Sequence, residues 1–207
     1  MTGIDDHLSR TGREVRDGGA DRAVVLRRGY DAPVQDVWDA CTDAERLGRW
    51  FLPVSGDLRL GGRYQLEGNA GGEIRRCEPP RLLLVSWEFG GNESEVEVRL
   101  SPDGDGGTAF ELEHRGIGDP EFWDRFGPGA VGVGWDMTAL GLGLYLAGTP
   151  VEDPVAWQSS PAARDFVSRT AAGWGEAHRT AGAPADQATA AAAETAAFYT
   201  PPTPTEP

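Results

Sequence analysis

The longest apolar stretch of the chain is residues 129–148, GAVGVGWDMTALGLGLYLAG, which holds a single charged residue, Asp136. Apolar residues recur in it at spacings of three and four, which predicts a helix. Because this helix is apolar on nearly every side, we expect other elements to surround it. Asp136, the internal glycines and the lack of flanking Lys or Arg argue against a membrane span.

Shorter runs, some rich in β-forming residues and some with alternating apolar and polar residues, precede this segment and predict β-strands. They lie at 23–30, 58–60, 63–67, 73–77, 82–89, 95–100 and 108–115. Gly-rich turns join many of them, which indicates an antiparallel sheet with one solvated face. The long helix is the element that should cover the other face. The segment 33–51 opens on Pro33 and predicts two short helices.

The two ends of the chain are expected to lie outside this domain. We divide the chain into a polar N-terminal arm (1–20), a domain (21–149), a helical extension (150–200) and a disordered tail (201–207). Residues 13–16 of the arm are expected to pair with the first strand. The extension predicts two helices, at 162–182 and 184–199. Its aromatic side chains need cover, either from the domain or from a second copy of the chain in a homodimer.

The order of these elements resembles the SRPBCC (START/birch-pollen-allergen-like) superfamily, and within it the activator-of-Hsp90-ATPase-homologue-like branch. The resemblance covers about residues 23–147. The matching residues are Ala32-Pro33, Val37-Trp38, Thr42-Asp43, Leu47, Arg49-Trp50-Phe51, Asp57-Leu58-Arg59, Gly61-Gly62, Pro79-Pro80, Trp87, Thr108, His114 and Gly134-Trp135.

This resemblance implies an α+β helix-grip (START-like) fold. A curved seven-stranded antiparallel sheet would surround a long C-terminal helix, with an apolar cavity between them. Members of the superfamily bind lipids, hormones and polyketides, and some are cyclases, dehydratases or hydrolases. Most bacterial members of the branch have no assigned activity, and no catalytic residue set is common to it. The resemblance therefore assigns no catalytic residue here.

The composition argues against several kinds of partner and cofactor. The net charge of −14 argues against nucleic acid and against an anionic membrane surface. Two cysteines make no disulfide framework, and the N-terminus lacks an apolar signal segment, so we expect a cytoplasmic protein. The three histidines are far apart in the sequence and no C-x-x-C or H-E-x-x-H motif occurs, so no metal is expected. The glycines of the long helix follow no strand, so no dinucleotide cofactor is expected either.

Aromatic residues are the main candidates for a ligand-binding cavity. The predicted wall consists of Trp38, Trp50, Phe51, Tyr64, Trp87, Phe110, His114 and Trp135. The alternative interpretation of each aromatic residue is core packing. His114 alternates with Phe110 and Leu112, so it should point inward, where a histidine could act as an acid or base. Asp136 and Tyr64 are the other catalytic candidates, provided that they face the same cavity.

Three functions remain open at this point. The preferred one is a cytoplasmic protein that binds a small apolar molecule. The second is an enzyme of the cyclase or dehydratase kind, in which His114 works with Asp136 or Tyr64 as acid and base. The third is a co-chaperone-like interaction protein. Two or more convergent ionisable groups in the cavity would favour the enzyme, whereas His114 alone would favour binding.

Overall fold

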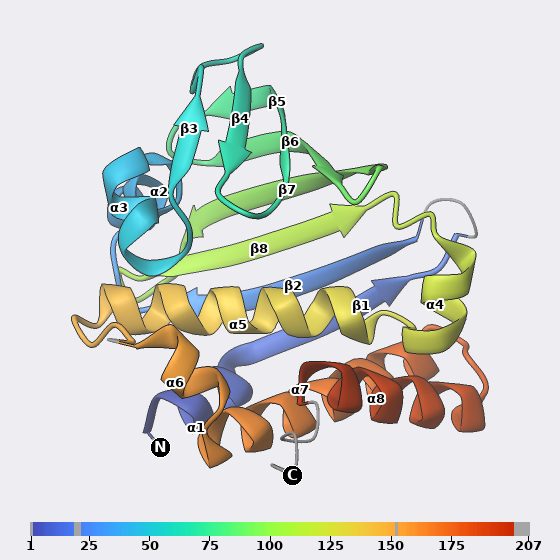
Figure 1. Cartoon of the computed structure of the whole chain (residues 1–207). Coiled ribbons are helices and arrows are strands. Elements are labelled where there is room, and N and C mark those ends of the chain that lie inside the picture. Colours follow the sequence, from blue (N-terminus) through green and yellow to red (C-terminus); the bar gives the residue numbers. More distant parts are fainter. Residues whose placement is uncertain (1, 19–21, 152, 201–207) are drawn as a thin grey trace, which may run out of the picture.

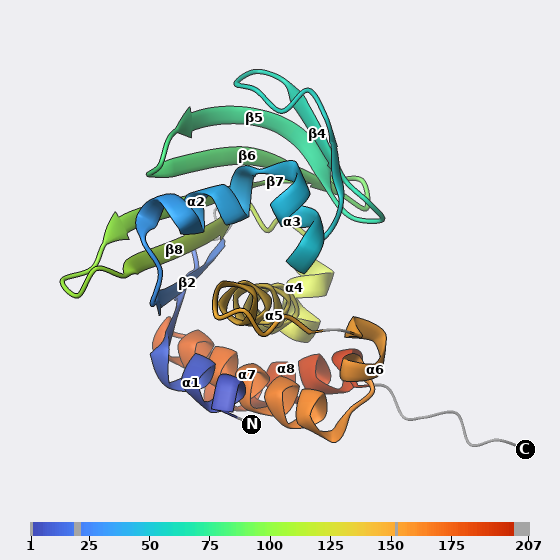
Figure 2. The ribbon, with the colours of Figure 1, turned by 90° about the vertical axis from the view of Figure 1, so that its left-hand side faces the viewer.

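The chain folds into three layers: a curved sheet, one long helix beneath it, and a set of helices below that helix (Figure 1, Figure 2). The computed structural model describes residues 2–18, 22–151 and 153–200. The strands are β1 (Thr11–Arg16), β2 (Ala23–Tyr30), β3 (Val54–Gly56), β4 (Arg63–Leu66), β5 (Gly71–Glu78), β6 (Leu82–Phe89), β7 (Asn92–Pro102) and β8 (Thr108–Arg115). The helices are α1 (Thr2–Arg10), α2 (Val34–Thr42), α3 (Ala44–Trp50), α4 (Pro120–Phe126), α5 (Gly129–Leu146), α6 (Pro154–Gln158), α7 (Pro161–Thr180) and α8 (Ala185–Tyr199).

The eight strands form one antiparallel sheet in the order β1-β2-β8-β7-β6-β5-β4-β3. Figure 2 shows α5 end-on, between the concave side of the sheet and the layer that contains α1, α7 and α8. This arrangement is the helix-grip fold predicted from the sequence. The strands predicted at 82–89 and 108–115 have the bounds of β6 and β8.

The sheet differs from the prediction at both of its edges. The N-terminal arm pairs with β2, as expected for 13–16, but it does so over Thr11–Arg16 and adds an eighth strand. The strand predicted at 58–60 is wrong. Those residues form a turn in which Gly62 N donates to Arg59 O, and the edge strand lies earlier, at Val54–Gly56. Leu58 and Leu60 are exposed in this turn, so their apolar side chains, on which the prediction rested, do not mark a strand.

Helix α5 contacts the C-terminal helices on the side that faces away from the sheet. A Cβ atom at Gly132 would lie 2.2 Å from Cε2 of Trp174 in α7, so only glycine allows this approach. Trp174 and Phe166 are fully buried, and the two predicted C-terminal helices cover α5 of their own chain. Among the described helices, none has the length and apolarity needed to span a membrane.

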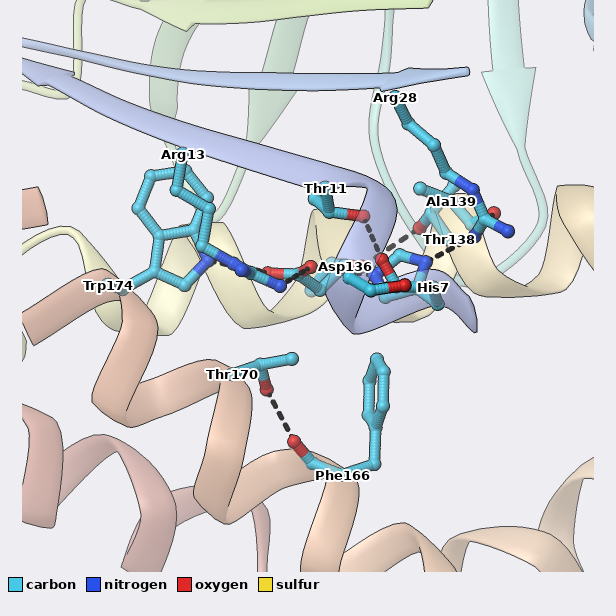
Figure 3. A network of polar contacts seen from close by, with 12 residues as sticks. His7, Thr11, Arg13, Arg28, Asp136, Thr138, Ala139, Phe166, Thr170 and Trp174 are labelled. Carbon is cyan, nitrogen blue, oxygen red and sulfur yellow. Dashed lines mark hydrogen bonds and ion pairs between the residues drawn. The ribbon is translucent and has the colours of Figure 1, made fainter. Parts of the chain in front are cut away.

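Asp136 lies at the centre of this buried layer (Figure 3). Its carboxylate is fully buried and accepts hydrogen bonds from His7 Nε2 at 2.8 Å and from Trp174 Nε1 at 2.7 Å. Arg13 donates two more, from Nε at 2.9 Å and Nη2 at 2.6 Å. One side chain of α5 therefore connects α1, β1 and α7.

The protonation state of this network follows from its geometry. Burial alone would raise the pKa of Asp136, but the hydrogen bonds from His7 and Arg13 and the positive charge of Arg13 hold it below its usual value. The Arg28 guanidinium contacts His7 Nδ1, and since arginine can only donate, Nδ1 accepts. His7 therefore carries its proton on Nε2 and is neutral, while Asp136 is ionised.

We predict that Asp136→Asn lowers the free energy of unfolding by about 3–5 kcal/mol, because it leaves the largely buried guanidinium of Arg13 without its anion. Urea denaturation followed by tryptophan fluorescence would measure the loss. The matched control is Glu194→Gln, which removes an exposed ion pair with Arg125; it should cost less than about 1 kcal/mol. Equal effects of the two substitutions would contradict the central role of Asp136.

Candidate functional site

A largely apolar cavity of about 200 Å³ lies between the concave side of the sheet and α5. Aliphatic and aromatic side chains from α3, α5 and the strands line it, together with Cys41 and Thr42 of α2. Six of the eight residues predicted for the cavity wall line this space: Trp50, Phe51, Tyr64, Trp87, Phe110 and Trp135. Leu58 and Leu60, in the exposed turn before β4, also contribute to the lining.

The other two predicted wall residues lie elsewhere. Trp38 is 5 % exposed and belongs to the hydrophobic core, while Cys41 and Thr42 of the same helix line the cavity. Cys77 lines it from β5. Both thiols are partly buried, and burial raises the pKa of Cys41 to about 12, so this cysteine stays a thiol at neutral pH.

His114 lines a second space of about 500 Å³, which we call the second chamber. The second chamber shares Phe51, Trp87, Trp135 and Thr138 with the first cavity. The indole rings of Trp87 and Trp135 are in contact, with their centroids 5.1 Å apart. The two spaces are therefore neighbours that have these side chains in common.

Both ring nitrogens of His114 are engaged in hydrogen bonds. Trp135 Nε1, which can only donate, lies 3.0 Å from His114 Nδ1, so Nδ1 accepts and Nε2 carries the proton. Nε2 lies 2.8 Å from Ser94 Oγ and donates to it, and Ser94 in turn donates to Trp87 O at 3.1 Å. His114 is 7 % exposed, as its alternation with apolar residues indicated, and burial lowers its pKa to about 4.

This arrangement does not activate Ser94 as a nucleophile. A serine needs a neighbouring base that accepts its proton, whereas here the imidazole donates to the hydroxyl. The remaining lone pair of His114 is already used by Trp135. His114 is thus a neutral link between β7, β8 and α5.

The other two catalytic candidates do not join His114. Asp136 belongs to the buried network with α1, β1 and α7, and it lines neither space (Figure 3). Tyr64 donates its hydroxyl proton to Ser86 O at 2.8 Å, and burial raises its pKa above the usual value. His114, Asp136 and Tyr64 therefore do not form the pair of convergent ionisable groups that would favour an enzyme. Asp119 and Tyr199 line the second chamber with His114, but Asp119 accepts from Phe122 N at the start of α4 and Tyr199 donates to Ala130 O.

Several polar residues of the site were not predicted from the sequence. Ser94 faces the same side of β7 as Val96 and Val98, and extending that alternation by one position would have identified it. Tyr199 lines the second chamber from α8, far away in the chain, and no local pattern indicates this.

Residues 31–147 match the profile of the family described as "Activator of Hsp90 ATPase homolog 1-like protein", and the chain belongs to this family. The crystal structure of CalU16 from Micromonospora echinospora is 40% identical, with a TM-score of 0.61, over 83% of this chain and 97% of that one. Its solution structure gives a TM-score of 0.65, at the same identity, over 83% of this chain and 94% of that one.

A more distant structure is that of DynU16, a protein of the dynemicin biosynthetic locus. It is 27% identical, with a TM-score of 0.53, over 62% of this chain and 48% of that one. No curated protein matches this chain.

We predict that His114 makes the protein less stable in acid. Its folded pKa of about 4 lies below the usual 6.5, so the unfolded chain binds this proton first. The neutral His114 ring contributes about 3 kcal/mol to the free energy of unfolding. This contribution is complete above pH 6.5 and is lost as the pH falls to about 4. Between pH 7 and pH 4, the free energy of unfolding of His114→Gln should therefore fall by about 3 kcal/mol less than that of the unchanged protein. Urea denaturation at the two pH values measures both changes. Parallel losses in both proteins would contradict this assignment.

Proposed function

We propose that this protein binds a small apolar molecule in the cavity between the sheet and α5. The observation that carries the proposal is the chemistry of the wall. Among its described residues the one charged side chain is Arg59, which is 79% exposed and bonded to Asp57. A space enclosed by aliphatic and aromatic groups favours a ligand that loses little hydration on entering.

The size of the cavity limits the ligand. A cavity of about 150 Å³ with an aliphatic and aromatic lining holds one benzene molecule. The cavity here, at about 200 Å³, therefore suits a single ring or a compact bicyclic compound. A longer molecule would have to extend beyond this space.

Binding is better supported than acid–base catalysis. Both nitrogens of His114 are occupied by Trp135 and Ser94, Asp136 is held by the buried network, and Tyr64 donates to a backbone carbonyl. The relation to DynU16 also favours a small molecule as ligand, because that protein comes from a biosynthetic locus. A cytoplasmic location and a homodimer remain predictions from the sequence.

We predict that naphthalene binds and changes tryptophan emission, because Trp50, Trp87 and Trp135 line the cavity. Val98→Phe places a ring in the same space and should weaken binding about tenfold or more, since a filled cavity has no room for the ligand. The matched control is Val155→Phe, at a position that is 76% exposed, which should leave binding unchanged.

Fluorescence titration of the three proteins distinguishes the outcomes. If naphthalene fails to bind the unchanged protein, the proposed function is wrong. If it binds Val98→Phe as tightly as the unchanged protein, the ligand occupies a different site. Thermal unfolding of each variant, without ligand, checks that the substitutions leave the fold intact.

A further inference from the structure

The second chamber lies where the family domain meets the C-terminal extension. Its wall includes Trp87, His114 and Trp135 from residues 31–147, together with Phe198 and Tyr199 from α8. The apolar ring of Phe198 is 56% exposed at this place. Helix α8 contacts both α4 and α5, which fixes the end of the extension against the chamber. The extension therefore builds part of this second space.

Each hydroxyl group that lines the chamber donates its hydrogen bond to a backbone carbonyl. Ser94 donates to Trp87 O at 3.1 Å, and Thr138 donates to Gly134 O at 2.9 Å. Tyr199 donates to Ala130 O at 2.5 Å. A hydroxyl has one proton and two acceptor lone pairs, so these three groups can offer only acceptors to a ligand.

Among the ring N–H groups of Trp135, His114 and Trp87, only one lacks a described acceptor. The indole N–H of Trp135 is used by His114, and the N–H of His114 is used by Ser94. The indole N–H of Trp87 has no hydrogen-bond partner among the described residues. Asn69 and Asn92 also line the chamber, and both are exposed. The chamber thus offers the oxygens of Ser94, Thr138 and Tyr199 as acceptors, and the carboxylate of Asp119, which accepts from Phe122 N, also lines it.

A hydroxyl group on the ligand matches this set. It can donate to one of the three hydroxyl oxygens, whereas an ether or a ketone has no proton to donate. A carboxylate would meet the three acceptors with its own lone pairs, and the net charge of −14 further disfavours an anion. The aromatic walls favour a ring next to the hydroxyl.

We propose that the second chamber binds the hydroxyl-bearing end of an elongated aromatic ligand, a phenol in its simplest form, whose other end occupies the first cavity. The shared side chains of Phe51, Trp87, Trp135 and Thr138 place the two spaces side by side. This proposal rests on the proposed function of the first cavity and assigns a ligand class to it.

The test uses three probes of one shape: 4-hydroxybiphenyl, 4-methylbiphenyl and 4-methoxybiphenyl. The unchanged full chain should bind the hydroxyl compound about fivefold more tightly than the other two, the ratio expected for one net hydrogen bond. The methyl probe controls for shape, and the methoxy probe can accept but not donate. Isothermal titration calorimetry gives the three dissociation constants.

Three variants then remove the accepting oxygens one at a time: Ser94→Ala, Thr138→Val and Tyr199→Phe. The hydroxyl preference should fall to about one in the variant that lacks the accepting oxygen. Ser94→Ala also leaves the His114 N–H without its partner, whereas Thr138→Val and Tyr199→Phe leave no buried N–H unpaired. The matched control is Thr189→Val, because Thr189 donates to Ala185 O in the same manner on the exposed side of α8; it should keep the full preference.

The outcomes separate this proposal from the one on which it rests. If naphthalene binds but the hydroxyl compound has no advantage over the methyl compound, the second chamber does not select hydroxyls and the inference is wrong. A preference that survives all three variants, or that is lost in Thr189→Val, also overturns it. If neither naphthalene nor any biphenyl binds, the proposed function itself has failed.

Discussion

The buried carboxylate of Asp136 is the interaction on which the other parts of the structure depend. A buried charge without partners is very unfavourable, so the groups that surround it have to be in place for the fold to be stable. Among the described residues, the side chains that donate to Asp136 are those of His7, Arg13 and Trp174, and they lie outside residues 31–147. The family domain contributes the anion and the two terminal segments contribute the donors. This explains how a helix arm and a helical extension become integral parts of one compact unit.

Helix α5, which carries Asp136, also links this network to the cavity. Trp135, the residue before Asp136, lines both spaces and donates to His114 of β8. Neighbouring residues of α5 thus bind the terminal layer on one side and the sheet on the other. Tyr199 of α8 adds a hydrogen bond to the carbonyl of Ala130, near the start of α5. The wall of the second chamber is therefore held by the elements that cover α5.

Local patterns predicted the parts of the fold that local physics determines. Strict alternation defined β8, a nearly continuous apolar run followed by a Gly-rich turn defined β6, and helical spacing defined α5. Helix α1 was missed because its sequence is polar, and His7 is buried by contacts with distant residues, among them Asp136, 129 positions later in the chain, and Phe166. The side of α5 on which Asp136 lies could not be predicted either, because α5 is apolar on nearly every side and has no polar face. Contacts between distant segments decided both positions.

All three histidines of the chain are buried, and burial lowers the pKa of each. In two of them a neighbour that can only donate, Arg28 for His7 and Trp135 for His114, occupies the acceptor nitrogen. These imidazoles are consequently fixed as neutral connectors, each with its single proton committed to Asp136 or to Ser94. Protonating either ring would direct an N–H at an existing donor. The same constraint that removes His114 from acid–base chemistry therefore keeps the hydrogen bonds of the second chamber in one arrangement, with acceptors left for the ligand.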